Sequence, residues 1–165
     1  NFRDWKRPVK FVELAKRLEH TNIKFKMCGR SSSKLRKEMS KISLPNFEYL
    51  GELPFEEANN LISKSHLFIN TSINKEGFPN TFIQSWFSGT PVLSLGVDPN
   101  NLITAKKLGK VCKDTSEMSR MVLYYNENRT ALKELSDSAK DYFSHSDIDN
   151  LSFSKLEKAI MEQVN

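Results

Sequence analysis

The chain has 165 residues, of which 38% are hydrophobic and 27% charged, and its formal net charge is +5 at pH 7. This length predicts one domain over residues 1–165 with one sizeable core, and the composition excludes low-complexity, repeat and membrane-spanning proteins. Because the lysines and arginines are scattered over expected helix faces, the basic charge favours a solvated surface over a nucleic-acid-binding stripe, although it also suits anionic lipid head groups or a diphosphate-bearing substrate.

Helices and strands are predicted to alternate in the first part of the chain. Pro8 suits the first position of a helix, and apolar residues at helical spacing follow it. Ser31 or Ser32 can cap a short basic helix. The expected helices cover residues 8–20, 31–41 and 55–65, and the expected strands cover residues 23–27 and 47–50.

The same alternation continues to the end of the chain. Gly89 is expected to end a helix whose aromatic residues Phe82, Trp86 and Phe87 belong to the core. The expected strands cover residues 67–70, 91–95 and 110–113, and the expected helices cover residues 80–88, 101–108, 116–126, 129–143 and 152–163.

Strand, helix, strand repeated at this spacing predicts an α/β fold: one Rossmann-like parallel sheet with right-handed crossovers and helices on both faces. Ligands of such sheets bind beyond the carboxyl ends of the strands. This rule selects the loops after Met27, Leu50, Asn70 and Leu95 as the candidate site.

The loop after the third of these strands contains the most informative stretch, Glu-Gly-Phe-Pro-Asn-Thr-Phe-Ile-Gln at residues 76–84. Gly77 frees the backbone and Pro79 fixes an extended turn before helical spacing begins at Asn80. The free N–H groups of a helix start attract phosphate, and a carboxylate such as Glu76 can accept hydrogen bonds from sugar hydroxyls. The alternative is an ordinary loop in which Asn80 is only an N-cap.

Residues 76–84, with Trp86, Gly89, Pro91 and Val92, resemble the signature of retaining glycosyltransferases of family 4 (group 1), in the C-terminal domain of a GT-B enzyme. In that family two glutamates separated by seven residues flank the helix start, and the second is Gln84 here. Glutamine keeps an acceptor for ribose hydroxyls but loses the charge, a difference of about 1 kcal/mol. Weaker landmarks extend the resemblance over residues 6–8, 11–15 and 47–51.

The resemblance implies roles for further residues. Lys6 resembles the lysine that neutralises the nucleotide diphosphate, and Arg3 or Arg7 would substitute for an arginine whose position falls on Asn1. The loop at Gly29 and Arg30 resembles one near the nucleotide, and the loop at residues 51–53 resembles one that receives the base. The implied catalytic residues are Glu76 and Lys6, and the implied substrate-binding residues are Arg3, Arg7, Gly29, Arg30, Gly51, Glu52, Leu53, Gly77, Phe78, Pro79, Asn80, Thr81 and Gln84.

Each of these residues also has a plain structural reading. Lys6 could be a solvated lysine at a helix start, Arg30 a surface residue and Gly51 a turn glycine. Asp147 and Asp149 match a two-aspartate metal pattern, but their place between two expected tail helices favours helix capping. His20, His66 and His145 have no metal-ligand spacing and no serine or cysteine motif beside them.

The resemblance implies a domain that binds a nucleoside-diphosphate sugar and transfers its glycosyl group, with retention, to a glycan or lipid-linked acceptor in polysaccharide biosynthesis. No metal and no cofactor besides the donor is expected. On this interpretation residues 1–165 lack an N-terminal acceptor domain and one upstream strand, so the isolated domain is expected to be inactive.

Two alternatives remain open: a non-transferring, epimerase-like GT-B enzyme, and a non-catalytic nucleotide-sugar-binding module, which the glutamine at position 84 favours. The polar start of the chain predicts no signal peptide and hence a cytoplasmic protein, with peripheral membrane association of the full-length form as a further possibility. Cys28 and Cys112 lie far apart without metal-ligand spacing, which favours buried free thiols over a disulfide.

Overall fold

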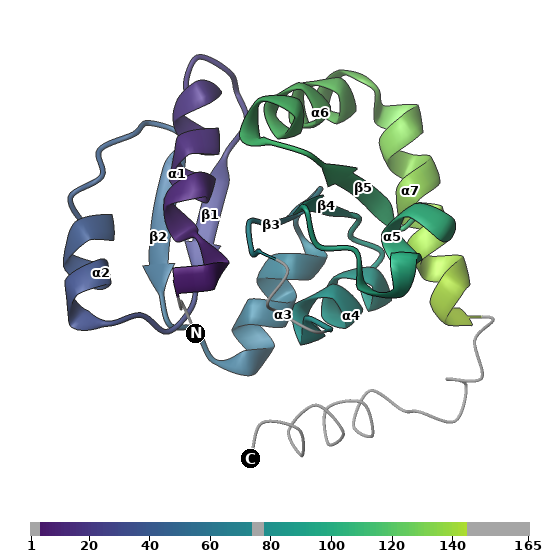
Figure 1. The fold of residues 1–165 in the computed structure, drawn as a ribbon, viewed down its shortest axis with the longest axis horizontal. Helices are drawn as coiled ribbons and strands as arrows, with labels where there is room; N and C mark the ends of the chain where they lie inside the picture. The colour runs from purple at the N-terminus through teal and green to yellow at the C-terminus, as the bar shows by residue number, and fades with distance from the viewer. Residues whose placement is uncertain (1–3, 74–77, 145–165) are drawn as a thin grey trace.

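The computed structural model describes residues 4–73 and 78–144 of the chain (Figure 1). The strands are β1 (Phe25–Cys28), β2 (Phe47–Gly51), β3 (Phe68–Asn70), β4 (Val92–Leu95) and β5 (Gly109–Cys112). The helices are α1 (Pro8–Arg17), α2 (Ser33–Met39), α3 (Phe55–Ser63), α4 (Asn80–Phe87), α5 (Leu102–Ala105), α6 (Thr115–Glu127) and α7 (Arg129–Ser144), with 3-10 turns η1 (Asp4–Lys6) and η2 (Pro99–Asn101). Most predicted elements of this region are confirmed with small shifts at their ends. The helix expected at 101–108 is shorter: α5 ends at Ala105, ahead of Lys107 with its positive φ of 54°. The helix expected at 152–163 lies outside the described residues.

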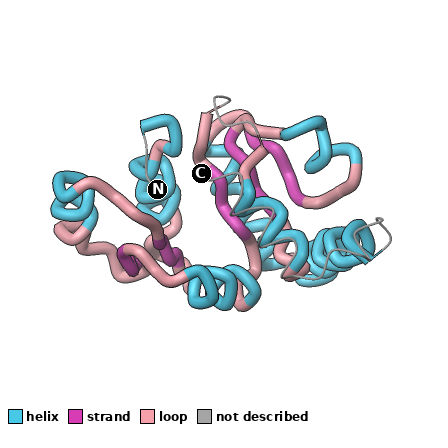
Figure 2. The backbone as a smooth tube through the Cα atoms, turned by 90° about the horizontal axis from the view of Figure 1, so that it is seen from below, coloured by secondary structure: helices cyan, strands magenta, loops and turns pink. Residues whose placement is uncertain are grey.

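All strand pairs are parallel, but they form two sheets rather than the single sheet that was predicted. Strands β1 and β2 pair with Phe25 opposite Phe47, and β3, β4 and β5 form a second sheet in that order, with Phe68 opposite Val92 and Val92 opposite Gly109. Figure 2 shows the strands in these two groups. In the described part of the chain no segment hydrogen-bonds to the free edges of β1 and β3, so the ladder is interrupted there.

Side-chain packing holds the two sheets together. One apolar cluster contains Leu14 of α1, Phe25 of β1 and Met118 of α6 together with Leu93 and Leu95 of β4. Helix α1 therefore covers the junction between the sheets and also packs against α6. Burial of apolar surface in this shared cluster, rather than strand pairing, joins the two sheets into one folded unit.

A second apolar cluster lies on the other face of β4. It contains Val92 together with Phe82 and Trp86 of α4, Ile103 of α5 and Ala139 of α7. Neighbouring residues of a strand point to opposite faces, and Val92 and Leu93 accordingly belong to different clusters. Every residue of β4 is buried, which confirms the prediction of an α/β fold with helices on both faces of the sheet.

The prediction for the aromatic residues of α4 is confirmed at two positions and wrong at one. Phe82 and Trp86 are fully buried, and the Trp86 indole N–H donates to the Leu108 carbonyl over 2.9 Å. Phe87 is 40% exposed. It follows Trp86 directly and is therefore turned by about 100° around the helix, away from the core-facing side.

Three smaller predictions are also decided. Ser32 caps α2 by accepting a hydrogen bond from the Leu35 N–H, whereas the Ser31 hydroxyl bonds to that of Tyr49 over 2.7 Å. Cys112 is a buried free thiol, and Cys28 is also free but only half-buried. Among the described residues, no helix combines the length and the apolar character that crossing a membrane requires.

Candidate functional site

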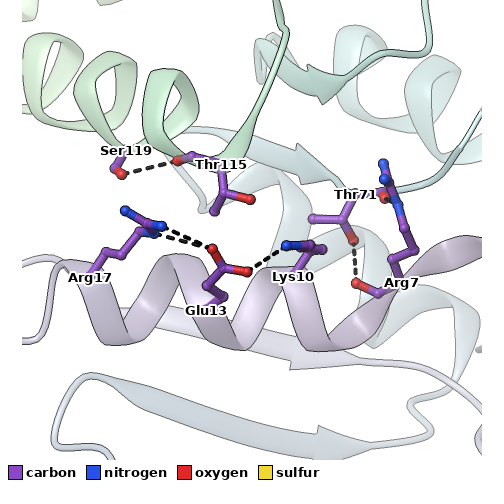
Figure 3. A network of polar contacts seen from close by, with 7 residues as sticks. All are labelled: Arg7, Lys10, Glu13, Arg17, Thr71, Thr115 and Ser119. Carbon is purple, nitrogen blue, oxygen red and sulfur yellow. Dashed lines mark hydrogen bonds and ion pairs between the residues drawn. The ribbon is translucent and has the colours of Figure 1, made fainter.

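The segment that carries Lys6 lies beside the loop that follows β3. The Ile73 N–H donates to the Trp5 carbonyl over 2.9 Å, and the Thr71 hydroxyl donates to the Lys6 carbonyl over 2.7 Å. The same hydroxyl donates to the Arg7 carbonyl over 3.1 Å, as Figure 3 shows. The structure thus brings Lys6 to the carboxyl end of β3, where the chain enters residues 74–77. Glu76, Gly77 and Arg3 lie outside the described residues, so their predicted roles stay predictions.

Arg7 is bound to the backbone at the carboxyl ends of two neighbouring strands. Its Nε donates to the Thr71 carbonyl over 2.7 Å, and its Nη2 donates to the carbonyls of Ser72 at 3.1 Å and Leu95 at 3.2 Å. Arg7 itself precedes α1 in a left-handed conformation with φ 44° and ψ 56°. Its guanidinium therefore spans the ends of β3 and β4.

Helix α4 begins without a side-chain cap. Pro79, not Asn80, is the N-cap residue, with φ −68° and ψ 118°, and Asn80 is the first helical residue. The alternative in which Asn80 merely caps this helix is therefore wrong: Pro79 already holds the extended conformation that an N-cap requires. The Phe82 N–H donates to the Pro79 carbonyl over 2.9 Å, and the described residues supply no capping side chain, so the N–H groups of Asn80 and Thr81 are the ones that could bind an anion.

The other predicted residues of α4 lie around this helix start. Thr81 follows Asn80 in the first turn, and Gln84 lies one turn further along the same face; all three are half-buried. Phe78 is 39% exposed, and its ring meets that of Trp86 edge-on at 6.2 Å. This contact holds the residue before Pro79 against the core side of α4.

The loops after β1 and β2 are brought together as the sequence predicts. The Gly29 N–H donates to the Gly51 carbonyl over 2.7 Å, which couples the two strand ends. Arg30 Nε lies 2.9 Å from Glu52 Oε1, and both side chains are well exposed. An exposed ion pair of this kind is weak, so a bound anion could draw Arg30 away from Glu52. Leu53 is half-buried next to this pair.

Buried polar residues lie at the base of the loops after β3 and β4, and the sequence pattern did not predict them. Asn70 Nδ2 donates to Ser94 Oγ over 3.2 Å, and the Ser72 N–H donates to Asn70 Oδ1 over 3.3 Å. Asn70, Thr71, Ser72 and Ser94 are all buried. Their polarity at the end of otherwise apolar strands was the available signal, since buried polar side chains need partners.

The loop after β4 is shaped by Asp98, which was also missed. Asp98 Oδ1 accepts from the Ile103 N–H over 2.8 Å, and Oδ2 accepts from the Thr104 hydroxyl over 2.6 Å. The carboxylate thus stabilises the start of α5 and gives the loop a defined course.

Of the three histidines and two tail aspartates considered above, the structure describes only His20 and His66. His20 lies 3.6 Å from Glu19, while His145, Asp147 and Asp149 lie outside the described residues. His66 lines a cavity of about 490 Å³ with Thr90, Pro91 and residues of α7. Because Pro91 immediately precedes β4, this cavity lies at the amino end of that strand, away from the candidate site.

Parallel sheets covered by helices on both faces, with loops gathered at the carboxyl ends of the strands, define a Rossmann-like domain of the kind that forms the C-terminal half of GT-B enzymes. The family model described as "Glycosyl transferases group 1" matches residues 3–128. The chain therefore belongs to the group 1 glycosyltransferases. It matches no curated protein.

Solved structures share this fold. HepE from Anabaena, in complex with UDP-glucose, is 14% identical with a TM-score of 0.73, and the match covers 99% of this chain and 46% of that one. A glycosyltransferase from Rickettsia africae is 19% identical with a TM-score of 0.71, covering 96% of this chain and 43% of the other. TarM is 22% identical with a TM-score of 0.73, covering 94% of this chain and 32% of the other. The chain thus spans less than half the length of each of these proteins.

Proposed function

We propose that this domain binds a nucleoside-diphosphate sugar and that the whole enzyme transfers the glycosyl group, with retention, to an acceptor held by an N-terminal domain. The observation that supports the proposal is that hydrogen bonds hold the segment with Lys6 at the carboxyl end of the strand that precedes α4. The Lys6 segment is hydrogen-bonded to the loop after β3, this loop leads into residues 74–77, and the uncapped start of α4 follows. A cation and free backbone N–H groups are what a diphosphate requires.

Each part has a role in the proposed reaction. The bond between the anomeric carbon and the diphosphate oxygen breaks, and the diphosphate leaves with the electron pair. The acceptor hydroxyl oxygen bonds to the anomeric carbon, and its proton passes to the departing diphosphate. Lys6 and the start of α4 stabilise the negative charge that develops on the departing diphosphate. Glu76 holds the sugar, Gln84 the ribose, and the loops at Gly29 and Gly51 receive the nucleoside.

Uridine nucleotides are the first donors to test, because HepE and TarM have been solved in complexes that contain UDP. The proposed acceptor is a glycan or lipid-linked saccharide, in polysaccharide biosynthesis in the cytoplasm or at the membrane surface. The reaction is proposed to need no metal and no cofactor besides the donor.

Calorimetry on the full-length protein with UDP, UDP-glucose and a panel of other sugar nucleotides tests donor binding. Release of nucleoside diphosphate in the presence of an acceptor pool tests transfer, and the anomeric configuration of the product, read by NMR, tests retention. Absence of binding to every sugar nucleotide would contradict the proposal.

Gln84 favours one second candidate, a nucleotide-sugar-binding module that has lost catalysis. The same experiment separates the two functions, because such a module would bind a donor but release no diphosphate with any acceptor. Conversion of the donor sugar without transfer would instead indicate an epimerase-like enzyme.

A further inference from the structure

Arg7 combines two features that each need an explanation. Its backbone is left-handed, a conformation that residues with a Cβ rarely adopt because the Cβ crowds the following carbonyl oxygen. Its side chain reaches three backbone carbonyls more than sixty positions away along the chain. The left-handed turn directs the chain from η1 into α1, and the guanidinium contacts provide stabilisation that offsets its strain.

The three contacts use most of the N–H donors of the Arg7 side chain. A guanidinium has five N–H donors, and Arg7 uses one on Nε and both on Nη2. The accepting carbonyls belong to Thr71, Ser72 and Leu95, at the ends of two paired strands. The Thr71 hydroxyl in turn donates to the Lys6 and Arg7 carbonyls. Hydrogen bonds in both directions therefore hold the segment of residues 6–7 against the loop after β3.

We infer that Arg7 is a positioning residue for the donor site and does not itself bind the diphosphate. It holds the Lys6 backbone against residues 71–73, so that Lys6 and the loop that leads to residues 74–77 keep a fixed relation to each other. This inference rests on the proposed function, and it assigns Arg7 a different task from the direct phosphate contact that the sequence suggested.

The two roles predict different behaviour for two substitutions in the full-length protein, measured by calorimetry with UDP. Arg7→Gly keeps the left-handed turn free of strain but removes the guanidinium, and we expect about tenfold weaker binding. Arg7→Lys keeps the charge, but a single ammonium cannot reproduce the guanidinium fork and the strain returns, so it should bind UDP no better than Arg7→Gly. Near-normal binding by Arg7→Lys would overturn the inference, because lysine serves well as a phosphate ligand.

A double-mutant cycle with Lys6→Ala supplies the second readout. If Arg7 acts through Lys6, the double variant loses clearly less affinity for UDP than the product of the two single losses. Losses that multiply would indicate an independent phosphate contact and would overturn the inference. Arg17→Ala is the matched control, because Arg17 is exposed on α1 and paired with Glu13, and it should leave UDP binding unchanged.

Thr71→Val keeps the inference testable if Arg7→Gly fails to fold. Valine has nearly the same shape as threonine but lacks the hydroxyl that donates to the Lys6 and Arg7 carbonyls. The substitution should weaken UDP binding severalfold. Combined with Lys6→Ala, it should cost less affinity than the product of the two single losses. Unchanged UDP binding by a folded Thr71→Val variant would count against positioning. If the wild-type protein binds neither UDP nor any other nucleoside diphosphate, the proposed function itself is wrong. If the wild-type protein binds UDP but the affinity losses of the variants multiply, only the positioning role of Arg7 is wrong.

Discussion

At the scale of single residues, Glu76 and Lys6 are assigned different parts of the same donor. Lys6 is placed at the carboxyl end of β3 by hydrogen bonds of its own and neighbouring backbone groups, whereas the sugar-binding role of Glu76, which lies outside the described residues, is a proposal from the sequence. The diphosphate and the sugar can therefore be tested separately.

Glu76→Ala should weaken a sugar nucleotide by about tenfold or more while changing the affinity for the bare nucleoside diphosphate much less, because the lost charge-assisted hydrogen bonds go to the sugar. Lys6→Ala should weaken both ligands. Calorimetry with UDP and UDP-glucose on the full-length protein checks this. If Glu76→Ala lowers the affinity for both ligands equally, Glu76 does not bind the sugar.

Gln84→Glu restores the charge that the family pattern has at this position. We expect unchanged binding of the donor, or binding up to about fivefold tighter, because a charged acceptor bonds ribose hydroxyls more strongly by about 1 kcal/mol. The same calorimetric titration measures the effect. A large loss of affinity would mean that this site uses position 84 differently.

Cys112 gives a prediction that does not depend on the proposed function. Burial raises the pKa of its thiol to about 11, above the ordinary value of a free cysteine, and nearby Glu117 acts in the same direction. The thiol form is therefore favoured by folding, and this stabilisation is complete below pH 9 and lost as the pH rises from about 9 to about 11. The loss amounts to up to about 3 kcal/mol of unfolding free energy.

Absorbance of the thiolate at 240 nm in a Cys28→Ala variant checks the ionisation of Cys112 directly. Denaturant unfolding at several pH values should show a steeper fall of stability above pH 9 for the protein with Cys112 than for Cys112→Ala. A thiol that ionises near pH 8.5 in the folded protein would contradict the burial argument.

At the scale of elements, the pairing of β4 and β5 depends on the close approach of the two backbones at Gly109. Its φ is 151°, and a Cβ there would lie 1.8 Å from the Val92 carbonyl oxygen. Val92 is itself buried in the middle of the second apolar cluster, so the backbone of β4 has little room to move.

Gly109→Ala should therefore lower the free energy of unfolding by about 3 kcal/mol or more, since relief of the clash requires the strands to separate. Gly96→Ala is the matched control: it also has a positive φ, but a Cβ there meets nothing within 4 Å, and it should cost only about 1 kcal/mol. Denaturant unfolding of the two variants measures the difference. Equal losses would show that conformational strain alone, without the clash, sets the cost.

At the scale of the whole molecule, the proposed active site lies between this domain and a second one. Residues 1–165 alone should bind donor weakly and transfer no sugar. Without the second domain the diphosphate is exposed to water, which lowers the energy of each charge–charge interaction severalfold. The acceptor is also no longer held in position. Positioning can contribute about 7 to 11 kcal/mol in well-oriented systems.

Incubation of the fragment and of the full-length protein with the same donor and acceptor pool checks this expectation. Only the full-length protein should release nucleoside diphosphate at an appreciable rate. Comparable turnover by the fragment would show that the chemistry is contained within residues 1–165 and that the two-domain interpretation is wrong.

Local patterns in the amino-acid sequence predict the order and type of most described helices and strands, and they also predict the edge of the sheet where the candidate site lies. This was possible because hydrophobic periodicity and helix punctuation are local signals: Pro8 begins α1, Ser32 caps α2 and Gly89 follows the end of α4. The motif at residues 76–84 also indicated the family, although Glu76 lies outside the described residues.

Features that depend on contacts between distant segments could not be predicted from these local patterns. The division into two sheets follows from backbone pairing that no local pattern encodes, and the exposure of Phe87 follows from what packs against α4. The contacts of Arg7 could not be predicted from the sequence either, because its three carbonyl partners lie 64 to 88 positions further along the chain. A basic residue next to Lys6 suggests a phosphate ligand in sequence, but the folded chain places its guanidinium on backbone carbonyls, where their negative partial charges hold it.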